Sequence, residues 1–237
     1  MLKHTTAIGS FLDSMSFETK RREHAAKTSV AFPFVTISRQ VAAGGHTLAD
    51  AVLAEMNEHD DEPLLEGWQL FDQQLCQVVA DDPKLKVTLS SLVEESVPSP
   101  IEELLKESLL GRAPQEVVHR RIFEIIHSVA SLGKVIILGR GAFCLTRGMR
   151  GGVHVRLVAP LELRIKRFQQ LRNIDSENEA RARLNKRDES RRKLVRAHFG
   201  QDIDNPLLYD AVFNTDSLDI VEIAHAVVGL IRRQTLC

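Results

Sequence analysis

A glycine turn between a strand-like run and a helix-like run is the first feature of this chain that is suited to chemistry. The stretch reads ISRQVAAGGHTLAD, residues 37–50, and its glycine pair Gly44 and Gly45 precedes His46 and Thr47. Glycines in such a turn let backbone N–H groups approach a phosphate, and the N-terminus of the next helix adds positive potential. The standard loop, G-x-x-x-x-G-K-[ST], carries a lysine where this chain has Gly45. The turn indicates either a phosphate site or an ordinary tight connection.

Two single residues stand at positions where a ligand could be recognised. Arg140 follows the apolar run VIILG, residues 135–139, and ligands of open α/β sheets bind beyond the carboxyl ends of the strands. Its planar guanidinium suits two-pronged contacts to phosphate, although an arginine there also caps loop carbonyls or pairs with carboxylates. Asp72, in LFDQQL, stands early in an expected helical segment, and by itself it indicates a helix N-cap.

A strongly basic stretch, RARLNKRDESRRKLVR at residues 181–196, holds eight Lys or Arg and two acids. Arg187 and Arg191 are four residues apart, so a helix brings them to one face. Asp188 lies beside that face and could orient an arginine. Composition alone favours a solvated charged helix or a weak nucleic-acid patch over a binding site.

The elements that must position these residues alternate between strands and helices, which predicts an α/β fold with a mostly parallel sheet. Short apolar runs bounded by glycine or proline indicate buried strands. Apolar residues at helical spacing indicate the helices. The expected strands are 31–38, 135–139, 153–159 and 211–215, and the expected helical segments are 46–57, 68–80, most of 84–132, one from about 160, 177–198 and 217–233.

Bulk properties exclude several classes of protein. The chain has 237 residues, suited to one large domain, and a net charge of −1, which gives no overall attraction to nucleic acid or anionic membranes. No apolar run approaches the roughly 18 residues that span a bilayer. Cys76, Cys144 and Cys237 show no metal-ligand spacing. We therefore expect a cytoplasmic protein with free thiols, no metal site built from cysteines or histidines, and a polar extension over residues 1–30.

Six segments occur in an order that resembles the cytidylate kinase-like family, relatives of the P-loop nucleoside monophosphate kinases. The resemblance covers about residues 32–233, and the ordered set is more specific than any one segment. The segments are VTISRQVAAGG, FDQQ at 71–74, ILGRGA at 137–142, VAPLELRIKR at 158–167, Asp188 to Arg191, and NPLLYDAVFNT at 205–215.

The resemblance implies a P-loop kinase-like domain over residues 31–237, with a parallel sheet flanked by helices, a helical acceptor-side insertion at about 68–132 and a basic lid at about 175–200. It implies phosphoryl transfer from ATP, with Mg²⁺, to a nucleoside monophosphate or a similar small acceptor. Neither a membrane nor a nucleic acid is an expected partner. The residues carried over are Arg39, Gly44, Gly45, His46 and Thr47 for the donor nucleotide, Asp72 and Arg140 for the acceptor, and Arg187, Asp188 and Arg191 for catalysis in the lid.

The chain departs from the pattern of true cytidylate kinases at several charged or flexible positions. Gly45 replaces the loop lysine, Ala42 and Ala43 replace a Gly-Ser pair, Gln73 replaces an arginine and Gly141 replaces an aspartate. The departures leave two functions in competition. One is a kinase, and the other is a nucleotide-binding sensor or regulatory module with little or no kinase activity.

An active enzyme would need another source for the missing charge. Arg39, just before the turn, and the pair Arg187 and Arg191 are the candidates. His46 is a weaker one, because a neutral imidazole supplies little charge at pH 7.

Overall fold

The computed structural model describes residues 32–59, 62–72 and 114–234. The expected extension at 1–30 lies outside the described residues. So do Gln73 and the part of the expected insertion from 73 to 113. No helix in the described ranges is long and apolar enough to cross a membrane.

The described core is a five-stranded sheet in the order β2-β3-β1-β4-β5, and every pairing in it is parallel. This confirms the expected α/β class. β1 lies at the centre, with β3 on one side and β4 on the other. The strands are β1 (Phe34–Arg39), β2 (Gln69–Phe71), β3 (Val135–Leu138), β4 (Gly152–Val158) and β5 (Ala211–Asn214).

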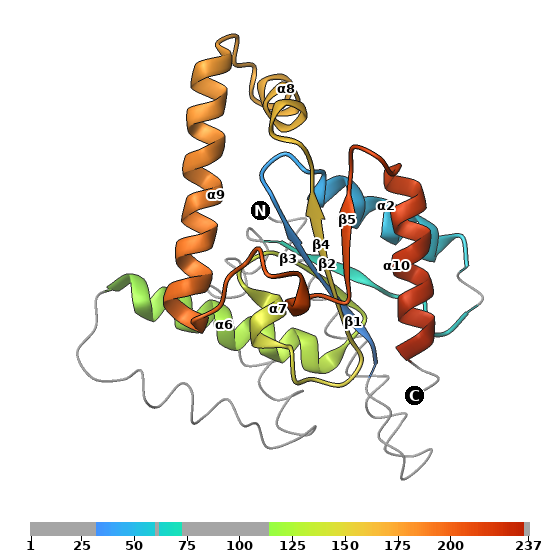
Figure 1. Cartoon of the computed structure of the whole chain (residues 1–237). Coiled ribbons are helices and arrows are strands. Elements are labelled where there is room, and N and C mark those ends of the chain that lie inside the picture. The colour runs from blue at the N-terminus through green and yellow to red at the C-terminus, as the bar shows by residue number, and fades with distance from the viewer. Residues whose placement is uncertain (1–31, 60–61, 73–113, 235–237) are drawn as a thin grey trace, which may run out of the picture.

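Helices cover both faces of the sheet (Figure 1). α2 (Gly45–Asn57) and α10 (Ile220–Gln234) lie on one face, and α6 (Pro114–Leu132) and α7 (Ala142–Leu145) on the other. Side chains of β1 alternate between these layers: Val35 packs toward α2 and α10, and Phe34 packs toward α6. Because both faces are covered, the central strands have continuous apolar runs.

α8 (Leu161–Arg172) and α9 (Glu177–Phe199) form an arm beside the sheet, and its upper part extends beyond the loop that follows β1 (Figure 1). Ser176 caps α9, because its hydroxyl accepts a hydrogen bond from the N–H of Glu179. Gly200 ends the helix in a left-handed conformation. The basic stretch expected at 177–198 is therefore one helix. A 3₁₀ turn, η1 (Pro206–Leu208), precedes β5.

One expectation was wrong. Residues 69–71 were expected to be helical, but they form β2 and pair with β3. Trp68 and Phe71 stand at helical spacing, yet Trp68 packs in the layer of α2 and Phe71 in the layer of α6. Residues three apart face opposite sides of a strand, so the same spacing here reflects burial on both faces. Asp72 consequently follows the carboxyl end of a strand, and the segment that it was expected to cap lies outside the described residues.

Candidate functional site

The loop after β1 has the expected strand-turn-helix form. Residues 41–44 make the turn and α2 begins at Gly45. Gly44 has a φ of 89°, and Ala42 also lies in the left-handed region, with a φ of 58°. A non-glycine residue held there costs about 1–3 kcal/mol and persists only when its surroundings fix it.

A buried ion pair fixes the loop to the α8–α9 arm. The Asp188 carboxylate accepts a hydrogen bond from the N–H of Val41 at 2.8 Å and pairs with Arg164 at 2.6 Å. Arg164 also donates to the carbonyls of Val41 and Ala159, at 3.4 and 3.0 Å. Asp188, expected in a catalytic role, therefore has its carboxylate directed at the loop backbone and at Arg164.

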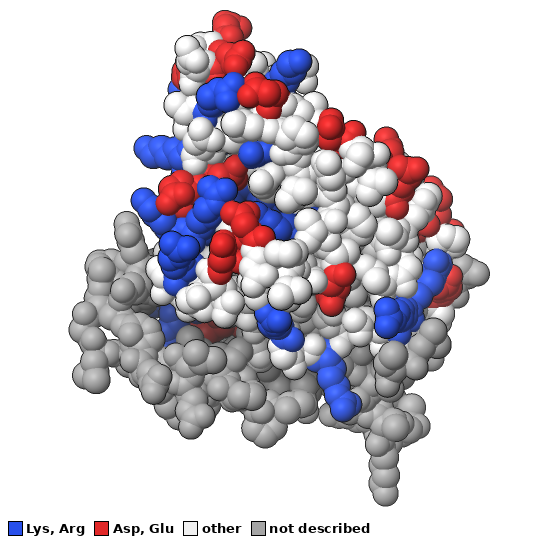
Figure 2. All heavy atoms as spheres, in the orientation of Figure 1, with Lys and Arg blue, Asp and Glu red and all other residues white. Residues whose placement is uncertain are grey.

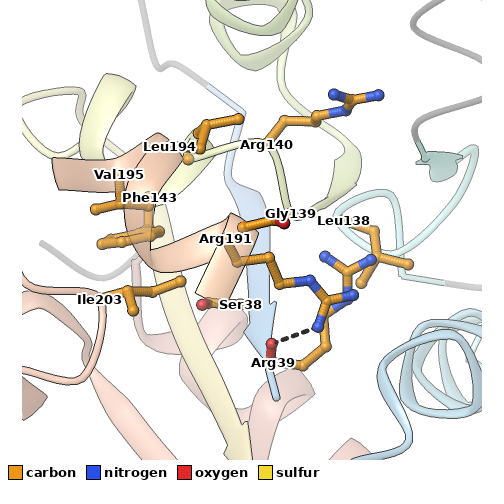
Figure 3. A pocket seen from close by; sticks show the side chains of 12 residues that line it. Ser38, Arg39, Leu138, Gly139, Arg140, Phe143, Arg191, Leu194, Val195 and Ile203 are labelled. Atoms are coloured by element: carbon orange, nitrogen blue, oxygen red, sulfur yellow. Dashed lines mark hydrogen bonds between the residues drawn. The ribbon is translucent and has the colours of Figure 1, made fainter. Parts of the chain in front are cut away.

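A cavity of about 250 Å³ opens at the carboxyl ends of β1 and β3, against α9. Among the described residues that line it are three arginines: Arg39 from the end of β1, Arg140 from the turn after β3, and Arg191 from α9. Figure 3 shows the guanidinium groups of Arg39 and Arg191 side by side, while the side chain of Arg140 extends away from them. The end of the cavity away from Arg39 and Arg191 is apolar, with Phe143 and Ile203 among the lining residues.

The arginine end of this cavity carries an excess of positive charge. Burial, followed by the charges of Arg191 and Arg140, lowers the pKa of Arg39 to about 9. Burial also lowers the pKa of Arg191, although Asp188 opposes this shift. Arg191 donates to the carbonyl oxygen of Arg39 at 3.0 Å and lies 3.6 Å from the carboxylate of Asp188. Clustered cations of this kind favour an anionic ligand.

Three other expected site residues lie at the edge of this region. His46 and Thr47 are exposed in the first turn of α2. The imidazole Nε2 of His46 is 3.7 Å from the carboxylate of Asp72, so Asp72 stands beside the loop. Arg187 is different, because its guanidinium lies over the ring of Phe168, 5.6 Å from the centroid. Of the two arginines expected to share a face, Arg191 lines the cavity and Arg187 does not.

A comparison with protein-family models matches residues 34–217 to the cytidylate kinase-like family. The chain belongs to this family. Its α/β core is therefore of the P-loop kinase type, and the arginine cavity lies where the strands of that core end.

Two cytidylate kinases resemble this cytidylate kinase-like chain in sequence. That of Methanocaldococcus jannaschii is 29% identical over 122 residues, which cover 51% of this chain and 66% of the relative, just under two thirds. That of Sulfolobus acidocaldarius is 28% identical over 134 residues, covering 56% and 72%. An uncharacterized protein from Eubacterium ventriosum has the same fold, with a TM-score of 0.63, 17% identity, and coverage of 85% of this chain and 99% of that one.

Sequence reasoning missed one arginine of this family member. Arg156, on β4, is only 3% exposed and donates to the hydroxyl of Ser38 at 2.9 Å. It also pairs with Asp204, which accepts a second hydrogen bond from Arg192 of α9 at 2.8 Å. This carboxylate therefore ties the sheet to α9 beside the cavity. The available signal was a lone arginine within the otherwise apolar strand VHVRLVA.

Acidic partners accompany most basic side chains of α9, and Figure 2 shows Asp and Glu atoms among the Lys and Arg atoms along it. Intervening carboxylates interrupt the continuous positive track that binds a phosphate backbone, so this pattern argues against a nucleic-acid surface in the family member. The pairs are Arg181 with Glu162 and Glu177, Arg183 with Glu179, Arg191 with Asp188, Arg192 with Asp204 and Glu189, and Lys193 with Glu189.

The packing of α9 gives a reason for the glycine beside Arg140. Gly141 has a φ of 69°, and a Cβ placed on it would lie 2.5 Å from the ring of Phe199. We expect Gly141→Asp, which restores the residue of true cytidylate kinases, to lower the free energy of unfolding by about 1–3 kcal/mol through backbone strain and crowding.

Urea unfolding measures this effect. Gly148→Ala is the matched control, because no atom lies within 4 Å of a Cβ at that position. Equal stabilities for the Gly141→Asp and Gly148→Ala variants would contradict the proposed packing constraint.

Proposed function

We propose that this protein transfers the γ-phosphoryl group of ATP to a nucleoside monophosphate or a similar small anionic acceptor. The observation that carries the proposal is that Arg39, Arg140 and Arg191 all line one cavity beside the loop after β1. Phosphoryl transfer depends on positioning and on neutralising charge on the phosphoryl oxygens. Fixed cations at this sheet edge supply both.

The residues divide between the two substrates according to the elements that carry them. Residues 41–47, with Arg39, would surround the donor phosphates, and Thr47 lies at the start of α2. Arg140 and Asp72 follow the neighbouring strands β3 and β2, so they would meet the acceptor. Arg191 would contact the group in transfer from the side of α9.

We propose that two segments complete this site, one by closing over it and one by holding the acceptor. α9, within residues 175–200, would act as a lid, and residues 68–132 would hold the acceptor. The tie between Asp188 and Val41 supports the first assignment, because movement of α9 would be transmitted to the loop. Closure of such a segment excludes water and completes the charged site.

The oxygen donors beside the loop suit Mg²⁺. The hydroxyl of Thr47 and the carboxylate of Asp72 are hard ligands, and Mg²⁺ in kinases is held by one or two such groups together with substrate phosphates. A bound Mg²⁺ would neutralise charge on the donor phosphates. The chain's own contribution is to orient these phosphates through the loop N–H groups and the arginines.

A nucleotide-binding role with little transfer is the competing proposal, and Gly45 at the lysine position favours it. The experiment that separates the two is a panel of CMP, dCMP, UMP, AMP and GMP, each incubated with ATP and Mg²⁺. In transfer, an acceptor phosphate oxygen bonds to the γ-phosphorus and ADP leaves, so each turnover yields one nucleoside diphosphate and one ADP.

Chromatographic separation of the nucleotides measures both products, and ATP without an acceptor measures background hydrolysis. The kinase proposal expects at least one acceptor to be converted well above that background. ATP binding without transfer to any acceptor would replace the kinase proposal with the binding-only one.

A further inference from the structure

We propose that Arg39 takes the place of the missing loop lysine, and that Gly45 is a glycine because the Arg39 side chain lies against it. The inference rests on the proposed function, since it assigns to Arg39 the contact with the donor phosphates. It selects one of the three charge sources that the sequence left open.

The side chain of Arg39 occupies the space into which a side chain at position 45 would grow. A Cβ placed on Gly45 would lie 2.9 Å from Cγ of Arg39, 3.1 Å from Cδ and 3.2 Å from Nε. Gly45 begins α2 without the positive φ that favours glycine, so its backbone does not require glycine. The limited space favours glycine instead, because real Cβ atoms essentially never come within 3.0 Å of another heavy atom.

The far end of the same side chain reaches the next loop. A Cβ on Gly139 would lie 2.0 Å from Nη1 of Arg39. Arg39 therefore runs from the end of β1, past the first residue of α2, to the turn after β3. Its guanidinium lies at the arginine end of the cavity, beside that of Arg191 (Figure 3).

The charge of this guanidinium is only partly offset: the charges of Asp72 and Asp188 favour it, while those of Arg191 and Arg140 oppose it. Across residues 32–59, 62–72 and 114–234, no side chain pairs with it or accepts a hydrogen bond from it. A largely buried charge without a partner is destabilising. An arginine kept there for structure alone would have a carboxylate or carbonyl acceptor, whereas one kept for a ligand receives its acceptors with the phosphate oxygens.

The other two charge sources, the pair Arg187 and Arg191 and the weaker candidate His46, have partners within the described residues. The guanidinium of Arg187 lies over the ring of Phe168. Arg191 donates to the carbonyl of Arg39 and lies near Asp188. His46 is exposed and faces the carboxylate of Asp72. Among these candidates, Arg39 therefore has a guanidinium that lines the cavity and makes no ion pair or hydrogen bond within the described part of the chain.

A double-mutant cycle on thermal stability tests the shared space. In the wild-type background, Gly45→Ala is expected to lower the unfolding midpoint because its methyl group meets Arg39. In an Arg39→Ala background the same change is expected to raise the midpoint, because alanine favours a helix over glycine. Gly229→Ala, in α10 with no atom within 4 Å of its Cβ, is the control and should raise the midpoint in both backgrounds. If Gly45→Ala shifts the unfolding midpoint in the same direction in both backgrounds, the two side chains do not compete for this space and the proposal is overturned.

A swap of the cation tests the assigned role. ATP binding with Mg²⁺ is measured by calorimetry for wild type, Arg39→Ala, Gly45→Lys and the double variant. Arg39→Ala is expected to weaken binding at least tenfold, and the lysine in the double variant to restore it to within about threefold of wild type. The proposal is overturned if Arg39→Ala binds like wild type, if the folded double variant binds no better than Arg39→Ala, or if wild type does not bind ATP.

This readout is separate from catalysis. The expected binding pattern without phosphoryl transfer in any variant would leave the role of Arg39 standing and remove the kinase function. Phosphoryl transfer by wild type, together with unchanged ATP binding in Arg39→Ala, would support the kinase function and remove the role of Arg39.

Discussion

Replacing Arg191 with alanine is expected to lower kcat about 10²- to 10³-fold while changing KM much less. Arg191 projects from α9 into the cavity and donates to the carbonyl of Arg39, directly before the loop that would hold the donor phosphates. An interaction made mainly in the transition state appears in kcat, whereas one made equally with bound substrate appears in KM. Steady-state kinetics with the acceptor found in the monophosphate panel measure both constants.

Arg183→Ala is the matched control for this experiment. Arg183 lies on the same helix, is exposed, and pairs with Glu179 one turn away, so its loss should change kcat less than twofold. A rise in KM at constant kcat for Arg191→Ala would show that Arg191 binds substrate without favouring the transition state. An unchanged kcat and KM would remove Arg191 from the site.

Replacing Asp188 with alanine is expected to lower the free energy of unfolding by about 3–5 kcal/mol, because it leaves the buried guanidinium of Arg164 without its partner. The N–H of Val41 also loses its acceptor. Both side chains of the pair are less than a tenth exposed. Urea unfolding monitored by far-ultraviolet circular dichroism measures the change.

The neighbouring Glu189→Ala is the control, because Glu189 is exposed and contacts Arg192 and Lys193 at 3.8 and 4.0 Å. Surface pairs of this kind contribute about 0–1 kcal/mol. A loss below about 1 kcal/mol for Asp188→Ala would contradict the buried-pair account.

A double variant, Arg164→Met with Asp188→Leu, separates stability from site geometry. Apolar replacement of both members of a buried pair is often neutral or stabilising, so stability should largely return. The N–H of Val41 would still lack its acceptor, so we expect the folded double variant to bind ATP more weakly than wild type.

The sheet was predictable because its central strands are short apolar runs buried on both faces. β3 and β4 were expected to within a residue or two for this reason. β2 was missed because three residues carry too little pattern to separate a strand from a helix. Its pairing with β3, rather than local preference, decides its structure.

The site was predictable where chain order implies position. Arg39 ends β1 and Arg140 follows the neighbouring parallel strand β3, so the rule for carboxyl ends places both at the same edge of the sheet. Rotation about a helix was harder to predict: Arg187 and Arg191 are one turn apart, yet Arg187 packs over Phe168 and Arg191 lines the cavity. The left-handed conformation of Ala42 has no local signal, because the tie between Asp188 and Val41 comes from 147 residues away.

The central claim is that the three arginines of the cavity form a phosphate site. Calorimetric titration of ATP with Mg²⁺ into wild type and into the triple variant Arg39→Met, Arg140→Met, Arg191→Met tests it most directly. The account predicts saturable binding by wild type and at least a hundredfold loss in the variant, with an unfolding midpoint that is unchanged or higher because like charges have been removed. Equal affinity of the two proteins for ATP, with both folded, would contradict it.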